Sequence, residues 1–178
     1  MKWQFFLLTG ILIAAVLVAA CTEEGTSGPE PEAIRVLQPG QILYSIGDVT
    51  GDGVPGGTII SITFTVGLVP GEKPVNMENI SIVYADAIRT ETLNPVKIYR
   101  GDPTVGEWGI VNVINEIGSS NNRLEDKEQF VIRINPNAPL VPRQFISIVV
   151  KPPSGTPLTI RRISPPSIIK ENNILAEI

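Results

Sequence analysis

The sequence predicts a mostly β domain, a β-sandwich of about eight strands, preceded by a hydrophobic N-terminal helix and a flexible tether. Three observations predict this class. Apolar and polar residues alternate in many short segments after residue 34. Turn-forming residues are abundant, because the chain contains 16 Gly and 16 Pro. No segment after residue 34 repeats its apolar residues with the period of an amphipathic helix.

Residues 1–20 form a hydrophobic segment for export, anchoring or assembly. Lys2 precedes a charge-free apolar run that reaches Ala20, and Glu23 and Glu24 follow it. The run is longer than the core of a typical signal peptide, about 7–15 residues, and shorter than a spanning helix of about 20. A positive charge before the run and negative charges after it agree with export of the rest of the chain.

Cys21 is the only cysteine of the chain and lies where the apolar run ends. The segment Val18-Ala19-Ala20-Cys21 resembles a bacterial-type lipoprotein signal, in which the thiol is acylated and the preceding peptide is removed. Cys21 is therefore a candidate lipidation site. A retained apolar helix and another kind of cleaved peptide are the alternatives. All three place the remaining residues outside the cytoplasm, at the cell surface or beyond it.

Residues 21–33 form the predicted tether. After Cys21 this stretch consists of Thr, Ser, Gly, Pro, Glu and Ala, without a large apolar side chain. Such a composition cannot bury enough apolar surface to offset the entropy that is lost on ordering. We therefore expect a flexible, partly extended spacer, followed by a single β domain over residues 34–178.

The predicted strands are recognised by their period-two patterns. In residues 58–66, Ile60, Ile62, Phe64 and Val66 alternate with Ser and Thr, as in a half-buried strand. Clusters of Gly, Pro, Asn and Asp separate the segments. Many short strands between such turns predict an Ig-like or Greek-key β-sandwich. The other strand candidates are residues 41–46, 79–85, 96–99, 108–115, 129–134, 144–151 and 156–163.

Composition excludes several classes of function. The chain has no histidine, which removes Ser-His-Asp triads and histidine-based zinc sites. A single cysteine excludes an internal disulfide and a paired-cysteine metal site. The net charge of −4 predicts no nucleic-acid partner. The spacing of acidic pairs, such as Asp102 and Glu107 or Glu125 and Asp126, does not indicate a glycosidase, so we expect no enzyme.

Residues 128–166 carry a succession of distinctive segments. EQFVI at 128–132 is followed by FISIVVKP at 145–152, by SGTPLTIRR at 154–162 and by Pro165-Pro166. This succession resembles the final strands of the archaellins, the archaeal flagellins, and NISIVYAD at 79–86 resembles a middle strand of that family. The apolar run at 12–20 is similar to the helix on which archaellins polymerise. Here, however, that run gives way to the tether instead of continuing as a long helix.

The resemblance covers about residues 35–170, mainly the outer β domain of the family. It implies a non-enzymatic structural subunit of an archaeal motility filament, or a closely related surface protein. It also implies self-association or contact with other archaellum or envelope proteins, and membrane contact through residues 1–20. The alternative is a lipid-anchored extracellular binding or adhesion module with the same kind of domain, because sandwich folds serve many functions.

Asp48 and Asp52 are candidate metal ligands. Residues 48–53, DVTGDG, begin like a calcium-binding loop, but Ile59 stands where an EF-hand has its closing acid. A looser Ca²⁺ site formed by the two carboxylates is one interpretation, and a turn without metal is the other. No other cofactor is expected.

Asn79 is a candidate glycosylation site, because Asn79-Ile80-Ser81 is a sequon without Pro at its middle position. Three further placements follow from the patterns. Trp108 is predicted to lie in the core. Arg161 and Arg162, adjacent on a strand, are predicted to point to opposite faces. Residues 125–128 are predicted to form a solvated loop of mixed charge.

Overall fold

The structure, a computed structural model, describes residues 37–178. The predicted N-terminal helix, Cys21 and the tether lie outside these residues. Within them the chain is mostly β, as expected, with eleven strands and one 3₁₀ turn, η1 (Met77–Asn79). No helix in residues 37–178 has the length and hydropathy of a membrane span. The strands are β1 (Leu43–Gly53), β2 (Ile59–Leu68), β3 (Val75–Asn76), β4 (Ser81–Asp86), β5 (Thr90–Arg100), β6 (Glu107–Ile114), β7 (Arg123–Leu124), β8 (Gln129–Asn135), β9 (Phe145–Lys151), β10 (Leu158–Ile163) and β11 (Asn173–Glu177).

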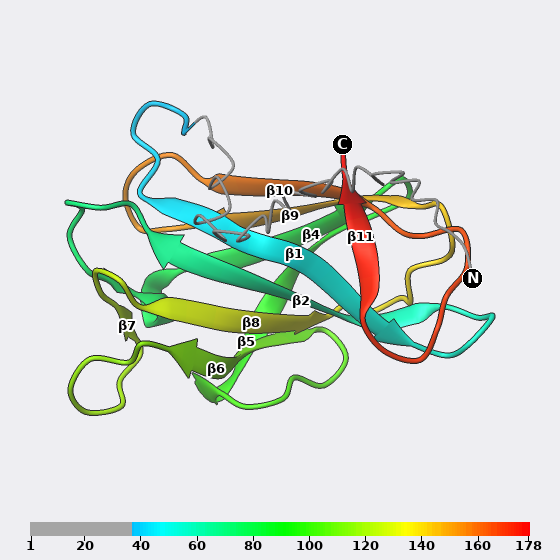
Figure 1. The fold of residues 1–178 in the computed structure, drawn as a ribbon, viewed down its shortest axis with the longest axis horizontal. Helices are drawn as coiled ribbons and strands as arrows, with labels where there is room; N and C mark the ends of the chain where they lie inside the picture. The colour runs from blue at the N-terminus through cyan, green and yellow to red at the C-terminus, as the bar shows by residue number, and fades with distance from the viewer. Residues whose placement is uncertain (1–36) are drawn as a thin grey trace, which may run out of the picture. The chain divides into compact units, whose positions relative to one another are not determined.

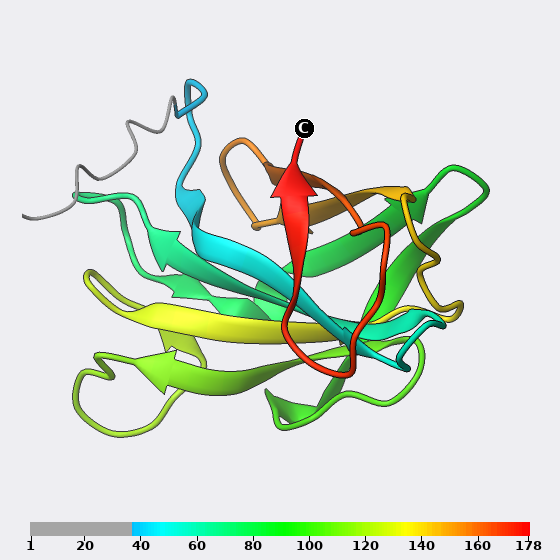
Figure 2. The same cartoon turned by 45° about the vertical axis from the view of Figure 1, so that its right-hand side comes forward.

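Nine of the strands form one sheet that closes on itself (Figure 1), in the order β1-β11-β10-β9-β4-β5-β6-β8-β2. The two short strands β3 and β7 pair separately. All neighbours in the ring are antiparallel except β5 and β6, which run parallel. Figure 2 shows β1, β2, β8 and β6 running side by side, with β11 crossing in front of β1.

The ring closes because two strands change partners along their length. Residues 90–93 of β5 pair with β4, whereas Asn94, Pro95 and Arg100 pair with β6. Residues 173–175 of β11 pair with β1, and residues 176–177 pair with β10. The β4-β9-β10 layer and the β1-β2-β8-β6 layer are therefore joined at both edges, with more strands than the eight expected for two separate sheets.

Alternate residues of the strands fill the core, as the period-two patterns predict. Phe130, Ile132 and Ile134 of β8 are each 1% exposed or less, and Arg133 between them is half-buried. The prediction for Trp108 is confirmed, since it is buried in β6 with its ring centroid 6.1 Å from that of Tyr99. The large buried side chains thus come from both layers and from the strands that join them.

A β-bulge changes the expected orientation of Ile60. Gly53 pairs with Ile59 and Asp52 pairs with Ser61, so Ile60 is an extra residue on β2. As a result Ile59 is 1% exposed and Ile60 is 47% exposed. The expectation that Ile60 shares the inner face with Ile62 is therefore wrong, because the bulge reverses the alternation at that point.

The loop before β8 is less solvated than its charges predict. Glu128 is only 2% exposed, and its carboxylate accepts backbone N–H groups of Ile117 at 2.6 Å and Glu125 at 3.0 Å. The expectation of a fully solvated loop over residues 125–128 is therefore wrong for Glu128. Its carboxylate instead accepts two partly buried backbone N–H groups and holds the β6–β7 connection close to the start of β8.

Tyr84 presents a buried hydroxyl inside the ring. The residue is 0% exposed, and its hydroxyl oxygen has no hydrogen-bond partner among residues 37–178. Burial, with a smaller contribution from the Asp86 charge, raises the pKa of Tyr84 above its ordinary value near 10. The phenol is therefore held in its neutral form in the folded protein.

The bulge can be tested with one pair of substitutions on β2. Phe64→Ala should lower the free energy of unfolding by about 3–5 kcal/mol, because it opens a cavity in the core. Ile60→Ala should change it by less than about 1 kcal/mol, because the side chain is half exposed. Urea unfolding of the two variants measures both values. Equal decreases in the free energy of unfolding would contradict the bulge, because they would indicate that Ile60 is buried on the inner face.

Tyr84 predicts a dependence of stability on alkaline pH. Because its pKa is raised on folding, its contribution to stability is complete below about pH 10 and is lost as the pH rises further. Tyr84→Phe should leave stability at neutral pH within about 1 kcal/mol of the parent, since no hydrogen bond is lost. The variant should also lose less stability than the parent between about pH 9 and 12 in thermal unfolding. Parallel pH curves would contradict the burial of this phenol.

Candidate assembly surface

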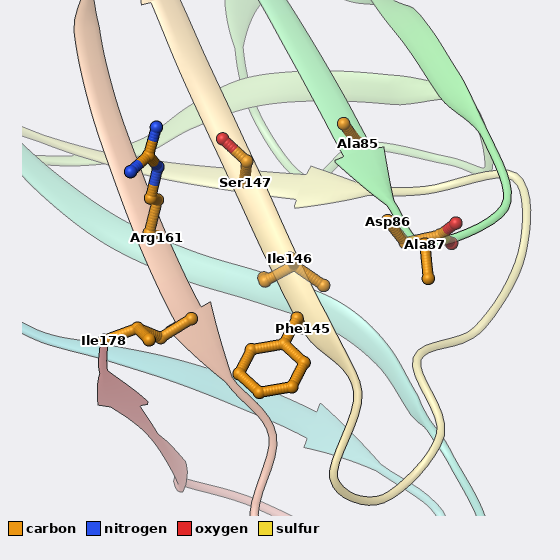
Figure 3. A pocket seen from close by; sticks show the side chains of 8 residues that line it. All are labelled: Ala85, Asp86, Ala87, Phe145, Ile146, Ser147, Arg161 and Ile178. Atoms are coloured by element: carbon orange, nitrogen blue, oxygen red, sulfur yellow. The ribbon is translucent and has the colours of Figure 1, made fainter.

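A shallow hollow of about 260 Å³ lies on the outer side of the β4-β9-β10 layer (Figure 3). It is open to solvent and mainly apolar. Figure 3 shows Phe145 and Ile178 close together at one end, with Ser147 and Arg161 toward the other. The lining residues are Ala85, Asp86, Ala87, Phe145, Ile146, Ser147, Arg161 and Ile178.

The hollow follows from side-chain size across three neighbouring strands. Ala85 of β4, Ser147 of β9 and Arg161 of β10 lie at the same level, because Ser147 pairs with both of the others. Two small side chains beside one another leave a depression on the outer face. Phe145 stands above it with 56% of its surface exposed, and Ile178 is 62% exposed. This apolar surface is contiguous, and such patches mark interaction sites more often than isolated exposed residues do.

Two charged side chains lie beside the hollow, and only one of them is left without a partner in the described residues. The carboxylate of Asp86 accepts the backbone N–H groups of Ile88 and Arg89 and forms an ion pair with the Arg89 side chain at 3.3 Å. The Asp86 carboxylate therefore stabilises the turn between β4 and β5 and is already occupied. By contrast, the Arg161 guanidinium is exposed and has no hydrogen-bond or ion-pair partner within residues 37–178. One free cationic group thus borders an apolar hollow.

The two adjacent arginines of β10 do point to opposite faces, as predicted. Arg162 is 8% exposed and forms an ion pair with Glu177 of β11 at 3.4 Å. It therefore helps to hold β10 against β11 at the place where the ring closes. Arg161 is the one that the fold leaves available to a partner.

A second exposed apolar surface lies near the end of β5, and we call it the Ile98 knob. Ile98 is 70% exposed, and both Ile98 and Tyr99 have positive φ angles, 65° and 63°. For a β-branched residue this left-handed conformation costs about 1–2 kcal/mol. The Ile98 side chain is solvent-exposed, while the Tyr99 ring contacts Trp108.

Hydrogen bonds around Arg100 hold the knob in this conformation. The side-chain amide of Asn122 donates to the Ile98 carbonyl at 3.3 Å, and Arg100 Nε donates to Asn122 Oδ1 at 3.2 Å. Arg100 also donates to the backbone carbonyl of Asn121 and binds Glu116 at 3.0 Å. The hydrogen bond from Arg100 holds the pKa of Glu116 below its usual range. The knob is thus fastened to the β6–β7 connection.

One acidic side chain accompanies the knob. Glu78 of η1 is exposed, and its Oε1 accepts the same Asn122 amide group, at 3.1 Å, that binds the Ile98 carbonyl. The Glu78 carboxylate therefore lies one side chain away from the backbone carbonyl of Ile98. The surface around Ile98 therefore includes an exposed apolar side chain and a nearby carboxylate.

The structure places the candidate metal ligands on one strand. Residues 48–53 belong to β1, so the turn expected there as the alternative to a metal site is wrong. Two extra β1 residues lie between the Ile46 and Thr50 pairings with β2, and Asp48 is exposed in this irregular stretch. Asp52 accepts the backbone N–H of Asn172 at 2.9 Å. Within residues 37–178 no group of three or more acidic, Cys or His residues could hold a metal ion.

The other candidate residues have separate environments. Asn79 is exposed as the last residue of η1, directly before β4, and is therefore open to modification. Glu107 caps a turn, because it accepts the backbone N–H of Thr104 at 2.9 Å and its hydroxyl at 2.7 Å. These hydrogen bonds lower the pKa of Glu107. Asp102 forms an ion pair with Arg133 at 2.6 Å. Glu107 and Asp102 therefore each serve local structure.

Sequence reasoning missed both exposed apolar surfaces. A weak signal existed for the hollow, because Phe145 and Ile146 are consecutive apolar residues at the start of a strand, and only one of them can face the core. No signal existed for the knob, since Ile is among the least expected residues for a positive φ angle.

Comparisons with known proteins identify the family. The sequence model of the archaeal-type flagellins matches residues 41–162. A crystal structure of the archaeal flagellin FlaB1 from Methanocaldococcus jannaschii is similar with a TM-score of 0.60 and 18% identity, over 76% of this chain and 98% of that chain. The archaeal flagellum of Methanospirillum hungatei strain JF1 gives a TM-score of 0.54 and 14% identity, over 76% of this chain and 71% of that chain. No curated relative matches in sequence.

The family match runs from the residues just before β1 into β10, so it covers most of the strands that form the core but not β11 or Ile178. The structural similarity at low identity supports the same fold independently. The chain belongs to the archaeal-type flagellin family.

Proposed function

We propose that the protein is a structural subunit, without enzymatic activity, of an archaeal surface filament of the archaellum type. The observation that carries this proposal is the family match over residues 41–162. Three of the acidic candidates, Asp52, Asp102 and Glu107, agree with a structural role, because they are engaged by backbone or arginine partners.

The closed sheet suits a filament subunit, because it limits unspecific pairing of strand edges between copies. An open sheet presents unpaired N–H and C=O groups that can pair with any other chain, whereas a closed ring has no such edge. Contacts between copies must then use side chains on the outer surface or segments outside the ring. The hollow and the Ile98 knob supply such side chains, and residues 1–20 supply an apolar segment.

We propose that residues 1–20 hold the protein in the membrane or in the filament core. Burial of this segment would contribute about 0.8 kcal/mol for each buried CH₂ group. The β domain would then face the exterior, with Asn79 as a glycan acceptor that can be modified without disturbing the core. A Ca²⁺ ion at Asp48 and Asp52 would need further ligands, such as backbone carbonyls or water.

A lipid-anchored module is the second candidate, and Cys21 favours it. The thiol lies directly after the apolar run, and the stretch that follows has the composition of a spacer. A cleaved and acylated chain would keep its β domain near the membrane as an adhesion or binding unit. The two candidates differ in the fate of residues 1–20, which makes the N-terminus decisive.

Deletion of residues 1–20 should separate assembly from folding. We expect the shortened chain to be a soluble monomer with a β-type far-UV circular dichroism spectrum, because the ring has its own core. The full chain should form long polymers visible by electron microscopy of material sheared from producing archaeal cells. A shortened chain with a mainly helical spectrum would contradict the fold. Full-length protein that never occurs in polymers would contradict the filament proposal.

Mass spectrometry of the mature N-terminus should distinguish the two candidates. For a filament subunit we expect a chain that retains its apolar segment, with Cys21 unmodified. A chain that begins at a diacylated Cys21 would favour the anchored module instead. Cys21→Ser provides the control, because it should release an acylated protein from membranes and leave a filament subunit unaffected.

A further inference from the structure

The hollow and the Ile98 knob lie at opposite ends of β5. Ala85, which lines the hollow, pairs with Thr90 at the start of that strand, and Ile98 lies near its end. Thr90 to Pro95 is five extended steps of about 3.3 Å, and the irregular stretch from Pro95 to Arg100 advances only as far as two residues of β6, so the two surfaces are separated by roughly 20 Å. One copy therefore cannot place its own knob in its own hollow.

We propose that the Ile98 knob of one copy docks into the hollow of a second copy of this chain. The proposal rests on the filament function and names a contact between the outer domains. Each copy would use its knob toward one neighbour and its hollow toward another.

The apolar parts of the two surfaces match in kind and size. Ile98 offers one branched aliphatic side chain that is 70% exposed. The hollow offers about 260 Å³ bordered by Phe145, Ile178 and the small Ala85. Docking would remove apolar surface from water on both sides, which is the main driving force of most protein association.

One pair of charges on the two surfaces is of opposite sign. Arg161 borders the hollow and has no partner within residues 37–178, and the Glu78 carboxylate accepts from the Asn122 amide that also binds the Ile98 carbonyl. Exposed Lys97, next to Ile98, and Asp86, which lines the hollow and is engaged by Arg89, are the other charges at the two surfaces. Docking of the knob would bring a cation and an anion toward one another. Such complementarity fixes the register of a contact and disfavours wrong partners.

The strained backbone of the knob supports a role outside the fold. Ile98 adds little to the core, since most of its side chain is exposed, yet it occupies a conformation that Asn or Gly would adopt more easily. Strain of this kind persists at binding surfaces when the surroundings enforce it. Here the Arg100–Asn122 hydrogen bonds enforce it.

The geometry of the contact leads to a chain of copies. The knob and the hollow are different surfaces, so the contact is heterologous, with each copy joined head to tail. A heterologous contact that does not close into a ring produces an open polymer. A contact of this type would reinforce a filament whose copies are already held by their N-terminal segments.

The first test is disulfide cross-linking of full-length protein in sheared polymers. Lys97→Cys and Ala87→Cys, combined in one chain, place thiols next to the knob and at the hollow without removing either. Mild oxidation should give a ladder of covalent dimers and higher oligomers. Lys97→Cys with Ser154→Cys is the matched control, because Ser154 is exposed in the turn after β9, beyond the end of that strand opposite to Phe145. Each single variant controls for cross-links through Cys21.

The second test separates assembly from stability with Ile98→Asn. Asn tolerates positive φ angles, so the variant should unfold at the same temperature as the parent or higher. Its polymers should require a roughly ten- to hundredfold higher subunit concentration, because an apolar anchor is lost. Val54→Asn, at another exposed apolar residue, should change neither quantity.

A charge exchange completes the design. Arg161→Glu should weaken the polymers, and Arg161→Glu combined with Glu78→Arg should restore them. Polymers that form without the Lys97–Ala87 ladder, or an Ile98→Asn variant that polymerises like the parent, would overturn this contact and leave the filament function intact. If the parent chain forms no polymer at all, the proposed function fails and the contact fails with it.

Discussion

The change of partners along β5 and β11 is the constraint on which this structure depends. Each of these strands gives part of its backbone hydrogen bonds to one layer and the rest to the other. A stack of two separate sheets would leave four open edges, whereas here β5 and β11 join the layers and cover part of each edge: β11 pairs with residues 49–51 of β1 and 162–163 of β10. The ring therefore limits unintended strand pairing of the β domain while its outer side chains remain available.

The same closure accounts for the unusual features of the surface. Near its end, β5 must return to β6 in parallel register after an irregular stretch between Pro95 and Arg100. The positive φ angles of Ile98 and Tyr99 lie in this stretch, and the Arg100 side chain ties it to the loop before β7. At the other edge, the end of β11 brings Ile178 beside Phe145. Both exposed apolar surfaces are thus products of the two strands that close the ring.

The acidic residues show how local structure can imitate a functional site. Asp52, Asp86, Glu107 and Glu128 each accept backbone N–H groups of turns or neighbouring loops. A carboxylate is well suited to this task, because a charge-assisted hydrogen bond is stronger than a neutral one. In a chain without histidine, such residues attract attention as catalytic or metal-binding candidates, although their partners are already present within the fold.

The sequence by itself determined the β class, the buried faces of β8 and β9, the burial of Trp108 and the family, because these depend on local alternation and on contiguous segments. Only the tertiary structure decided the closure of the ring, the bulge that exposes Ile60, the burial of Glu128, the hollow and the Ile98 knob. Each of these depends on which distant strand lies alongside. Phe145 and Ile178, for example, are more than thirty residues apart in sequence, and no local sequence pattern predicts that they line the same hollow. Pairing between distant strands is a non-local property, because it is decided by how all the core side chains pack together.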